Sequence, residues 1–311
     1  MRERFTSTFD VETHADTQEL LARSDIDVVD ICTPPSLHPR MIRAAADAGK
    51  HALSEKPLAL DFSEAAEAVA HAQRQGVQVG VMQNYRYRPE YVEARNAVVG
   101  GRIGRPFMAS LQALLHWYGG AEYRKQAEKM LVLEVGYHYI DLLRFLLDAD
   151  VTRVYAVLGR PETTPIAGDT YSAMILHFNN GAVGNIVNSG EVHGARTNWG
   201  GEAVVQGTSG TVFVNHRQHN TFGIYSTGSG GFAERTWPTE LYGLSTNISF
   251  GTPLSAYFAS FLKRGVFPVT GADNLNTLAA VVAAYESAAR GEPVDVQTAA
   301  AGAQAVLAGA R

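Results

Sequence analysis

The sequence predicts an α/β chain in which a parallel sheet comes first and an α+β domain with a mainly antiparallel sheet follows. Between residues 18 and 82, short apolar runs alternate with helical patterns, as in βαβ units. After about residue 85 strand patterns dominate, and the Asn-Asn-Gly sequence at 179–181 indicates a hairpin turn between two of them. We therefore divide the chain into a first domain, residues 1–85, and a second domain, residues 86–311.

Three strands and two helices are expected in the first domain. The strands cover residues 28–32, 51–53 and 77–82, and the helices cover residues 39–48 and 63–75, after a helix that ends at residues 18–23. Gly49 and Gly76 follow the two helices, where glycine adopts the left-handed conformation that often ends a helix. Since a helix separates each strand from the next, the three strands should run parallel.

The second domain opens with a helix at residues 90–99 and continues mainly with strands. We expect these strands at residues 107–114, 151–158, 171–178, 182–187, 203–206 and 211–214. An apolar stretch at 130–147 is long enough for a helix, and residues 255–290 return to a helical pattern. Glycine-rich residues 228–231 are expected in a loop, and the tail after residue 297 forms a last helix or a frayed end.

The composition favours a small-molecule partner. The formal net charge is -5, and acidic and basic residues are mixed, so we expect no binding to nucleic acid or to a membrane. No stretch approaches the ~20 apolar residues that span a bilayer. The single cysteine, Cys32, favours a cytoplasmic location and should be a packing residue at the end of a buried strand. No cluster has zinc-site spacing, so we expect no metal.

Each expected strand of the first domain ends in a distinctive tripeptide. The three are Thr33-Pro34-Pro35, Glu55-Lys56-Pro57 and Asn84-Tyr85-Arg86. Carboxyl ends of parallel strands form the ligand crevice of an open α/β sheet, and the prolines should hold Thr33 and Lys56 at its edge. The alternative is that the tripeptides are only strand-ending turns, but three in series favour a ligand site.

A second group of polar residues lies within the expected helix at 130–147. At about 100° per residue, Glu134, His138 and Asp141 fall within roughly a 60° sector and form one polar stripe. Burying two carboxylates and an imidazole is unfavourable unless they pair or serve a site. The stripe therefore predicts catalytic residues. The alternative is a histidine that is hydrogen-bonded to a capping or packing carboxylate.

These side chains suit an alcohol oxidation. Histidine titrates nearest neutrality, so His138 fits the group that takes the hydroxyl proton. Glu134 would orient the imidazole, or Asp141 would do so instead or bind a substrate hydroxyl. Lys56 would hydrogen-bond the same oxygen and stabilise its developing charge. The sequence leaves the division of these roles open.

Taken together, several short motifs resemble the Gfo/Idh/MocA family, which includes glucose-fructose oxidoreductase and inositol dehydrogenase. They are Asp27 to Pro35 with His38, Ala45 to His51, Glu55-Lys56-Pro57, Arg86, Gly101-Arg102-Ile103-Gly104 and Gly136 to Asp141. The resemblance implies a Rossmann domain, then an α/β domain with a large open sheet. It also implies NAD or NADP as cofactor, a sugar or polyol substrate between the domains, and a homo-oligomer, dimer or tetramer, formed through that sheet.

The resemblance also assigns residues. Lys56 matches the family's catalytic lysine and His138 its catalytic histidine, with Glu134 and Asp141 as further catalytic candidates. The positions expected near the cofactor are Thr33, Pro34, Pro35, His38, Glu55, Lys56, Pro57, Asn84 and Arg86. The family's substrate contacts often lie in the loop that here contains Trp117 and Tyr123, and the expected substrate site also includes Lys56, His138 and Asp141.

The sequence departs from the family pattern in two places. Many members have aspartate where this chain has Glu134, so the proton path or the substrate orientation should differ. The family's first strand, G-x-G-x-x-G turn, helix and second strand have no counterpart, so we expect a truncated Rossmann-type sheet from a fragment or a mis-assigned start codon. The residue that discriminates NAD from NADP would lie in that segment.

Three functions remain open at this point. The leading hypothesis is NAD(P)-dependent hydride transfer to or from a sugar, cyclitol or related polyhydroxy compound. A retained NAD would instead oxidise the substrate transiently, so that a glycoside is hydrolysed or a hydroxyl group is eliminated. The third hypothesis is a non-catalytic truncated paralogue that acts as a subunit or as a ligand-binding module.

Overall fold

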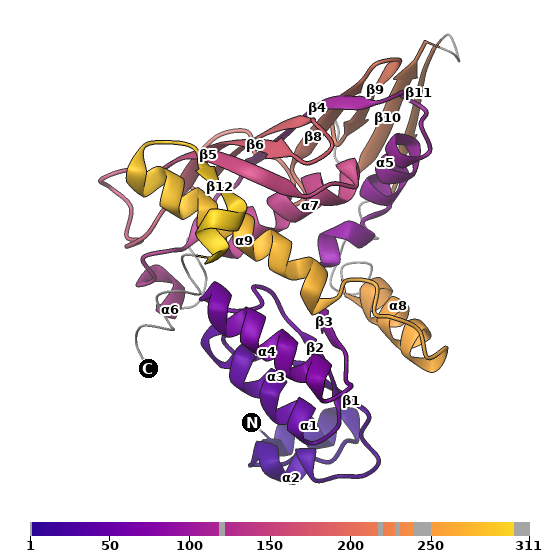
Figure 1. Ribbon diagram of the computed structural model, residues 1–311, viewed down its shortest axis with the longest axis vertical. Helices are drawn as coiled ribbons and strands as arrows, with labels where there is room; N and C mark the ends of the chain where they lie inside the picture. The colour runs from indigo at the N-terminus through magenta and orange to yellow at the C-terminus, as the bar shows by residue number, and fades with distance from the viewer. Residues whose placement is uncertain (1, 118–121, 217–219, 228–230, 239–249, 302–311) are drawn as a thin grey trace.

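The computed structural model describes residues 2–117, 122–216, 220–227, 231–238 and 250–301. These residues form two sheets, one of three strands and one of nine (Figure 1). In Figure 1 the large sheet lies at the top, and the small sheet lies below it with two of its helices. Residues 228–230 of the expected loop and residues 302–311 of the expected tail lie outside the described residues.

The small sheet is parallel, as predicted. It consists of β1 (Val28–Ile31), β2 (His51–Ser54) and β3 (Val79–Val81), paired in that order. Helices α3 (His38–Asp47) and α4 (Phe62–Arg74) connect the strands, and α1 (Arg2–Phe9) and α2 (Thr17–Leu21) precede them. Gly49 and Gly76 have φ values of +70° and +72°, which confirms that they end α3 and α4 in the left-handed conformation.

One prediction about this sheet is wrong. Cys32 was expected to be buried, but it lies one residue past the end of β1 and its side chain is exposed. Ile31 packs into the core, whereas its neighbours Asp30 and Cys32 are both exposed, because successive side chains of a strand point to opposite faces. Burial nevertheless affects the thiol, since partial desolvation and the nearby Asp30 raise the pKa of Cys32 to about 11.

The large sheet is mainly antiparallel, as predicted, and has the order β11-β10-β9-β8-β4-β7-β6-β5-β12. Its strands are β4 (Pro106–Leu114), β5 (Val151–Gly159), β6 (Tyr171–Phe178), β7 (Val183–Ser189), β8 (Glu202–Gly207), β9 (Gly210–Val214), β10 (Thr221–Ser226), β11 (Gly231–Thr236) and β12 (Val294–Asp295). The one parallel pair in this sheet is β4 with β7. Gly181, at φ +86°, lies in the predicted turn between β6 and β7. The sequence analysis missed β10, β11 and β12.

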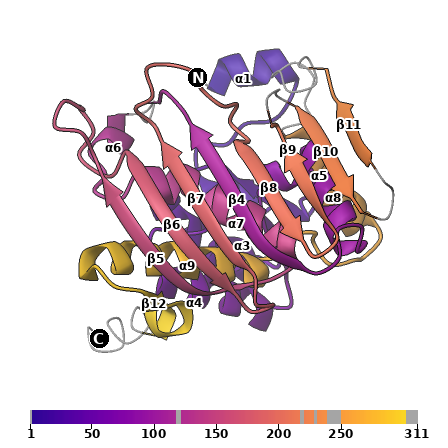
Figure 2. The ribbon, with the colours of Figure 1, turned by 90° about the horizontal axis from the view of Figure 1, so that it is seen from above.

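Helices cover one face of the large sheet. Helices α5 (Pro89–Val99), α7 (Tyr137–Leu147) and α9 (Gly271–Arg290) lie behind the strands in Figure 2. Alternation along the strands buries Val154 and Leu176 on this side and leaves Tyr155 and Ile175 exposed on the other. Helix α9 contacts both β5 and α4, and it therefore connects the large sheet to the first part of the chain (Figure 1).

The helix expected at residues 255–290 is divided in two. Helix α8 (Gly251–Leu262) ends before Gly265 and Pro268, and α9 begins at Gly271. Proline cannot continue a helix at this point because it lacks the backbone N–H. The connecting segment, with Tyr257 of α8, packs on the small sheet, in a cluster of Leu53, Met82, Tyr257, Phe267 and Val269. Residues assigned to the second domain thus help to form the core of the first, and the boundary at residue 85 stays a prediction.

The helix expected at residues 130–147 also differs from the prediction. Residues Val132–Gly136 form a π-helical turn, and α7 begins only at Tyr137. The Asp169 carboxylate accepts hydrogen bonds of 2.8 Å from the backbone N–H groups of Met130 and Val132, so it caps this segment. A π turn has more residues per turn than an α-helix. The spacing of 100° per residue therefore holds between His138 and Asp141, which both lie in α7, but not between Glu134 and His138.

Candidate active site

Lys56 lies two residues past the end of β2 and reaches the π turn that precedes α7. Its ammonium Nζ donates to the backbone oxygen of Glu134 at 2.7 Å and to the carboxylate Oε2 of the same residue at 3.2 Å. The two side chains are only 15% and 9% exposed. An ammonium has three N–H donors, so the structure leaves one donor of Lys56 for a ligand oxygen.

Glu134 binds cations and not the imidazole that it was expected to orient. Besides Lys56, its carboxylate contacts the Arg124 side chain, with Nε 3.3 Å from Oε1. Two positive charges therefore meet one buried carboxylate. Glu134 holds Lys56 in place, which is a different role from the one the sequence predicted.

His138 lies in the first turn of α7, and its side chain is buried. The imidazole stacks on the Tyr85 ring with a centroid distance of 4.1 Å and an interplanar angle of 11°. Its Nδ1 lies 3.2 Å from Oε1 of Gln83. Burial, and then the positive charges of Lys56 and Arg88, hold the pKa of His138 well below its ordinary value. This direction favours the neutral imidazole near pH 7.

Asp141 is not part of this arrangement, although it was expected to share one face with His138. Arg86 donates to both of its carboxylate oxygens at 2.6 Å, and the Thr277 hydroxyl donates to Oδ1 at 2.9 Å. The Asp141 side chain is 1% exposed. Both oxygens of Asp141 are thus bonded and buried in an ion pair, and its assignment as a catalytic and substrate-binding residue stays a prediction.

Arg86 was expected to bind the cofactor, but its guanidinium is engaged by aspartates. Besides Asp141 it contacts Asp273 of α9 at 3.0 Å, and Arg144 of α7 contacts the same aspartate at 2.8 Å. Burial alone would raise the pKa of Asp273, but Arg86 and Arg144 hold it below its ordinary value. We call Arg86, Asp141, Arg144 and Asp273 the ion-pair cluster. It joins the segment after β3 to helices α7 and α9.

His38 is also placed differently from the prediction. Its side chain is fully buried, and its two ring nitrogens lie 2.8 Å from the carbonyl oxygens of Pro57 and Thr33. These carbonyls belong to the tripeptides that follow β2 and β1. His38 therefore holds two strand ends together, and its assignment as a cofactor-binding residue stays a prediction.

The other expected cofactor positions lie at the strand ends. Pro34 is exposed, Pro35 and Pro57 are buried, and Thr33, Glu55 and Asn84 are partly exposed. The Thr33 hydroxyl oxygen is buried and has no hydrogen-bond partner within the described ranges. Burial raises the pKa of Glu55, and the Lys56 charge opposes this change. The strand ends thus present an unsatisfied hydroxyl and a partly exposed amide and carboxylate, which fits a polar ligand at this edge.

The two aromatic residues of the expected substrate loop differ in their surroundings. Trp117 packs edge-on against Trp199, with ring centroids 5.9 Å apart. Tyr123, on the short helix α6 (Glu122–Lys125), is 48% exposed and lies under the Arg124 guanidinium, 5.0 Å from its ring centroid. Because Arg124 contacts Glu134, Tyr123 is connected to the Lys56 environment.

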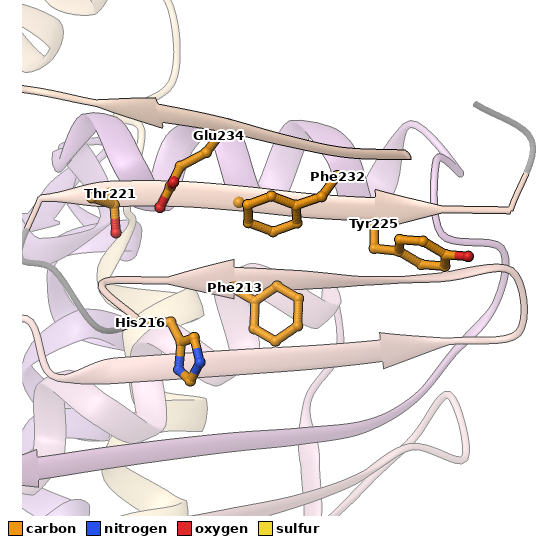
Figure 3. Close-up of a pocket in the computed structure, with 7 residues that line it drawn as sticks. Phe213, His216, Thr221, Tyr225, Phe232 and Glu234 are labelled. Atoms are coloured by element: carbon orange, nitrogen blue, oxygen red, sulfur yellow. The ribbon is translucent and has the colours of Figure 1, made fainter. Parts of the chain in front are cut away.

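A hollow of about 560 Å³ lies elsewhere, on the outer face of strands β9 to β11 (Figure 3). Phenylalanine, tyrosine, histidine and glutamate side chains line it, as Figure 3 shows, and none of them is a predicted site residue. Within the described ranges, no group of three or more His, Cys, Asp or Glu side chains is arranged to hold a metal ion. The helices described here include none that is long and apolar enough to cross a membrane.

The sequence analysis missed two residues of the site. Gln83 precedes the third tripeptide by one residue, and its side chain is fully buried against His138. Arg124 was noted only through its neighbour Tyr123. A buried polar residue at the end of an apolar run was the available signal for Gln83, whereas nothing local distinguishes Arg124 from a solvated arginine.

Two family models match the chain. The GFO/IDH/MocA model, described as an oxidoreductase family with an NAD-binding Rossmann fold, matches residues 2–83. The GFO/IDH/MocA C-terminal domain matches residues 91–213. Together these matches cover the small sheet and strands β4 to β8 of the large sheet.

Curated relatives align over most of their length. D-apiose dehydrogenase of Paraburkholderia graminis is 31% identical over 304 residues, which cover 94% of this chain and 79% of that protein. The NAD(+)-dependent scyllo-inositol 2-dehydrogenase of Bacillus subtilis is 30% identical over 294 residues, which cover 90% and 81%.

Solved structures share the fold. An oxidoreductase from Agrobacterium radiobacter in complex with NAD+, L-tartaric acid and magnesium has a TM-score of 0.88 at 25% identity, over 96% of this chain and 88% of that chain. Levoglucosan dehydrogenase in complex with NADH and L-sorbose has a TM-score of 0.84 at 25% identity, over 95% and 86%.

Proposed function

Because this chain belongs to the GFO/IDH/MocA family of NAD-binding oxidoreductases, we propose that it interconverts a hydroxyl and a carbonyl group of a sugar, cyclitol or related polyhydroxy compound. Relatives named as dehydrogenases of apiose and scyllo-inositol support this substrate class. The observation that carries the proposal is the pairing of a buried neutral imidazole, His138, with a lysine that retains a free donor, Lys56.

In the proposed reaction, bound NAD(P) accepts the hydride from the carbon that carries the hydroxyl group. Lys56 donates its remaining N–H to the substrate oxygen and stabilises the negative charge that develops there. The proton of the hydroxyl passes to the neutral imidazole of His138, which becomes charged. Glu134 keeps the ammonium of Lys56 in position, and the reverse reaction uses the same groups in the opposite direction.

We propose that the strand ends hold the nicotinamide half of the cofactor. Thr33, Glu55 and Asn84 are partly exposed at this edge, and the buried hydroxyl oxygen of Thr33 lacks a partner in the described part of the chain. Pro34, Pro35 and Pro57 fix the backbone beside them. The choice between NAD and NADP is left to measurement.

We further propose that two or more copies associate through the outer face of the large sheet. Exposed apolar side chains from neighbouring strands lie on this face, among them Tyr155, Val157, Ile175 and Val187. No described helix covers it (Figure 2), and contiguous exposed apolar surface is typical of protein interfaces. The cytoplasm is the proposed location, because the chain has one cysteine and therefore forms no internal disulfide.

The test is hydride transfer by the wild-type chain and by Lys56→Ala and His138→Ala, followed through the absorbance of the reduced nicotinamide. A panel of pentoses, hexoses and cyclitols is screened with NAD and with NADP. Both variants should lose about 10²- to 10⁴-fold in kcat, while Lys263→Ala, at an exposed lysine of the α8 end, should match wild type.

The outcomes separate the candidate functions. Equal rates in wild type and both variants would exclude this site as the catalytic centre. Product formation without net change in the cofactor would identify transient oxidation followed by elimination or hydrolysis. No turnover and no nucleotide binding by calorimetry would favour a non-catalytic ligand-binding role.

A further inference from the structure

Gln83 is a buried amide at the end of the third strand, and it directly contacts the imidazole of His138. Its side chain is 0% exposed, and its Oε1 lies 3.2 Å from Nδ1 of His138. The backbone fixes this position, because the N–H of Met82 bonds to the carbonyl of Ser54 at 2.8 Å and the N–H of Gln83 bonds to the carbonyl of Val81 at 2.8 Å. The amide therefore approaches the imidazole from a rigid strand.

The chemistry of this contact determines which ring nitrogen carries the proton. An amide oxygen accepts hydrogen bonds and cannot donate one. Nδ1 of His138 must then be the donor in the neutral ring, and the second nitrogen, Nε2, keeps its lone pair. The lone pair of Nε2 is the group that the proposed function needs as proton acceptor.

The ring is also fixed in orientation. Tyr85, two residues after Gln83, stacks on the imidazole face, and the Arg88 guanidinium lies 4.5 Å from the centroid of the Tyr85 ring. One short segment after β3 therefore holds both the face and the edge of the imidazole. The stacking contact holds the plane of the ring, and a 180° flip within that plane would lose the hydrogen bond at Nδ1.

We propose that Gln83 is a positioning residue that selects the Nδ1–H tautomer of His138 and aims Nε2 at the substrate hydroxyl. The proposal rests on the proposed oxidoreductase function. In the oxidation, the C–H bond breaks as hydride passes to NAD(P)+ and the O–H bond breaks as its proton passes to Nε2. The carbonyl forms, and Nδ1–H remains bonded to Gln83 throughout.

The type of side chain matters as well as its position. A neutral amide leaves the imidazole uncharged, whereas a carboxylate at the same position would favour the imidazolium ion. In the imidazolium form Nε2 carries a proton and cannot accept another. Glutamine thus provides the hydrogen-bond acceptor that selects the Nδ1–H tautomer. It adds no negative charge that would favour the imidazolium and so remove the lone pair of Nε2.

The first experiment needs no substrate. In the ¹⁵N-labelled protein near neutral pH, the imidazole signals of His138, assigned by comparison with His138→Gln, should show a protonated Nδ1 and an unprotonated Nε2. Gln83→Leu should lose this preference. A protonated Nε2 in the wild-type protein, or an unchanged tautomer in Gln83→Leu, would overturn the proposal. If the protein shows the Nδ1–H tautomer but oxidises no polyol, the role of Gln83 in selecting the tautomer is supported and the proposed function is contradicted.

The second experiment measures kinetics with the substrate found in the screen. Gln83→Leu should reduce kcat at least about tenfold with little change in the KM for the nucleotide. Gln83→Glu should restore part of kcat at high pH and move the acidic limb of the kcat/KM profile upward by about one pH unit or more. If the acidic limb of the kcat/KM profile does not move in Gln83→Glu, the assignment of Gln83 as the partner of Nδ1 is contradicted.

A matched control is available in the same strand region. Gln78 is a partly buried glutamine whose side chain bonds to the backbone of Gly265 and Phe267, away from His138. Gln78→Leu should lower the melting temperature but leave the tautomer and the pH profile unchanged. If Gln83→Leu does not fold, the wild-type tautomer and the Gln83→Glu profile still decide the question.

Discussion

Two polar clusters lie where the end of β3 meets helix α7, and they differ in how completely their polar atoms are bonded. In the ion-pair cluster, Arg86 and Thr277 occupy both oxygens of the Asp141 carboxylate. In the other, which we call the proposed proton-transfer cluster (Lys56, Gln83, Glu134 and His138), the described residues occupy two donors of Lys56, and in the tautomer that we propose Nε2 of His138 keeps its lone pair. A saturated cluster stabilises the fold, whereas a cluster with spare bonding capacity can act on a ligand.

The largest effect is expected from breaking the ion-pair cluster. Asp141→Ala removes the bidentate partner of Arg86, which keeps Asp273, while Arg144 keeps Asp150 and Asp273. Removing one partner of a buried ion pair costs about 3–5 kcal/mol. Urea unfolding measures the change. Asp295→Ala is the control, because the Arg153–Asp295 pair is 53% and 61% exposed and should contribute less than about 1 kcal/mol. An equal loss of unfolding free energy in the two variants would show that the ion-pair cluster contributes no more to stability than an exposed ion pair.

A smaller effect, mainly on activity, is expected from the second cluster. Glu134→Gln removes the charge that holds Lys56 and Arg124, while the backbone oxygen of Glu134 still accepts from Lys56 at 2.7 Å. We expect kcat/KM to fall about tenfold. The free energy of unfolding should also fall, because the pair is buried, but by less than in Asp141→Ala, since Lys56 keeps its bond to the backbone oxygen. Destabilisation as large as in Asp141→Ala would abolish the distinction between the clusters.

The smallest effect concerns the pH dependence of stability. The folded state holds the pKa of His138 well below its ordinary value, so the unfolded chain binds a proton at a higher pH than the folded chain does. The free energy of unfolding should therefore fall as pH drops below about 6.5, by up to about 1.4 kcal/mol per pH unit from this group. His138→Gln should lack this component, as measured by denaturation at several pH values. Identical pH profiles would show that His138 is not desolvated.

Much of the fold could be predicted because the signals are local. Alternating apolar runs predicted all three parallel strands, and Gly49, Gly76 and Gly181 adopt the positive φ angles that their turns require. The elements missed or misplaced lack such signals: β12 has two residues, and Gly223 interrupts β10. The expected long helix at 255–290 is interrupted because Gly265 and Pro268 oppose helical continuation, a local signal that the prediction overlooked.

The candidate site was predictable only in part. Lys56 and His138 stood out because a lysine at a strand end and a histidine in an apolar stretch are unusual, and the structure brings both to the same carboxylate-lined edge. His38 and Asp141 also stood out, but they bond to carbonyl groups and to an arginine in the interior. A polar residue in an apolar run can be recognised in the sequence, but the sequence does not show whether it binds a ligand or stabilises the fold.

The sequence by itself determined the order of the elements, the residues at the strand ends and the family resemblance, because these depend on neighbours along the chain. The tertiary structure alone decided which polar groups meet. Lys56 binds Glu134 across 78 residues, and Gln83 reaches His138 across 55. Glu134 lies in the π turn at Val132–Gly136, which Asp169 caps, and not in a regular α-helix as the sequence predicted. Partner choice between distant side chains is set by how the segments pack, and that packing is not encoded in any local pattern.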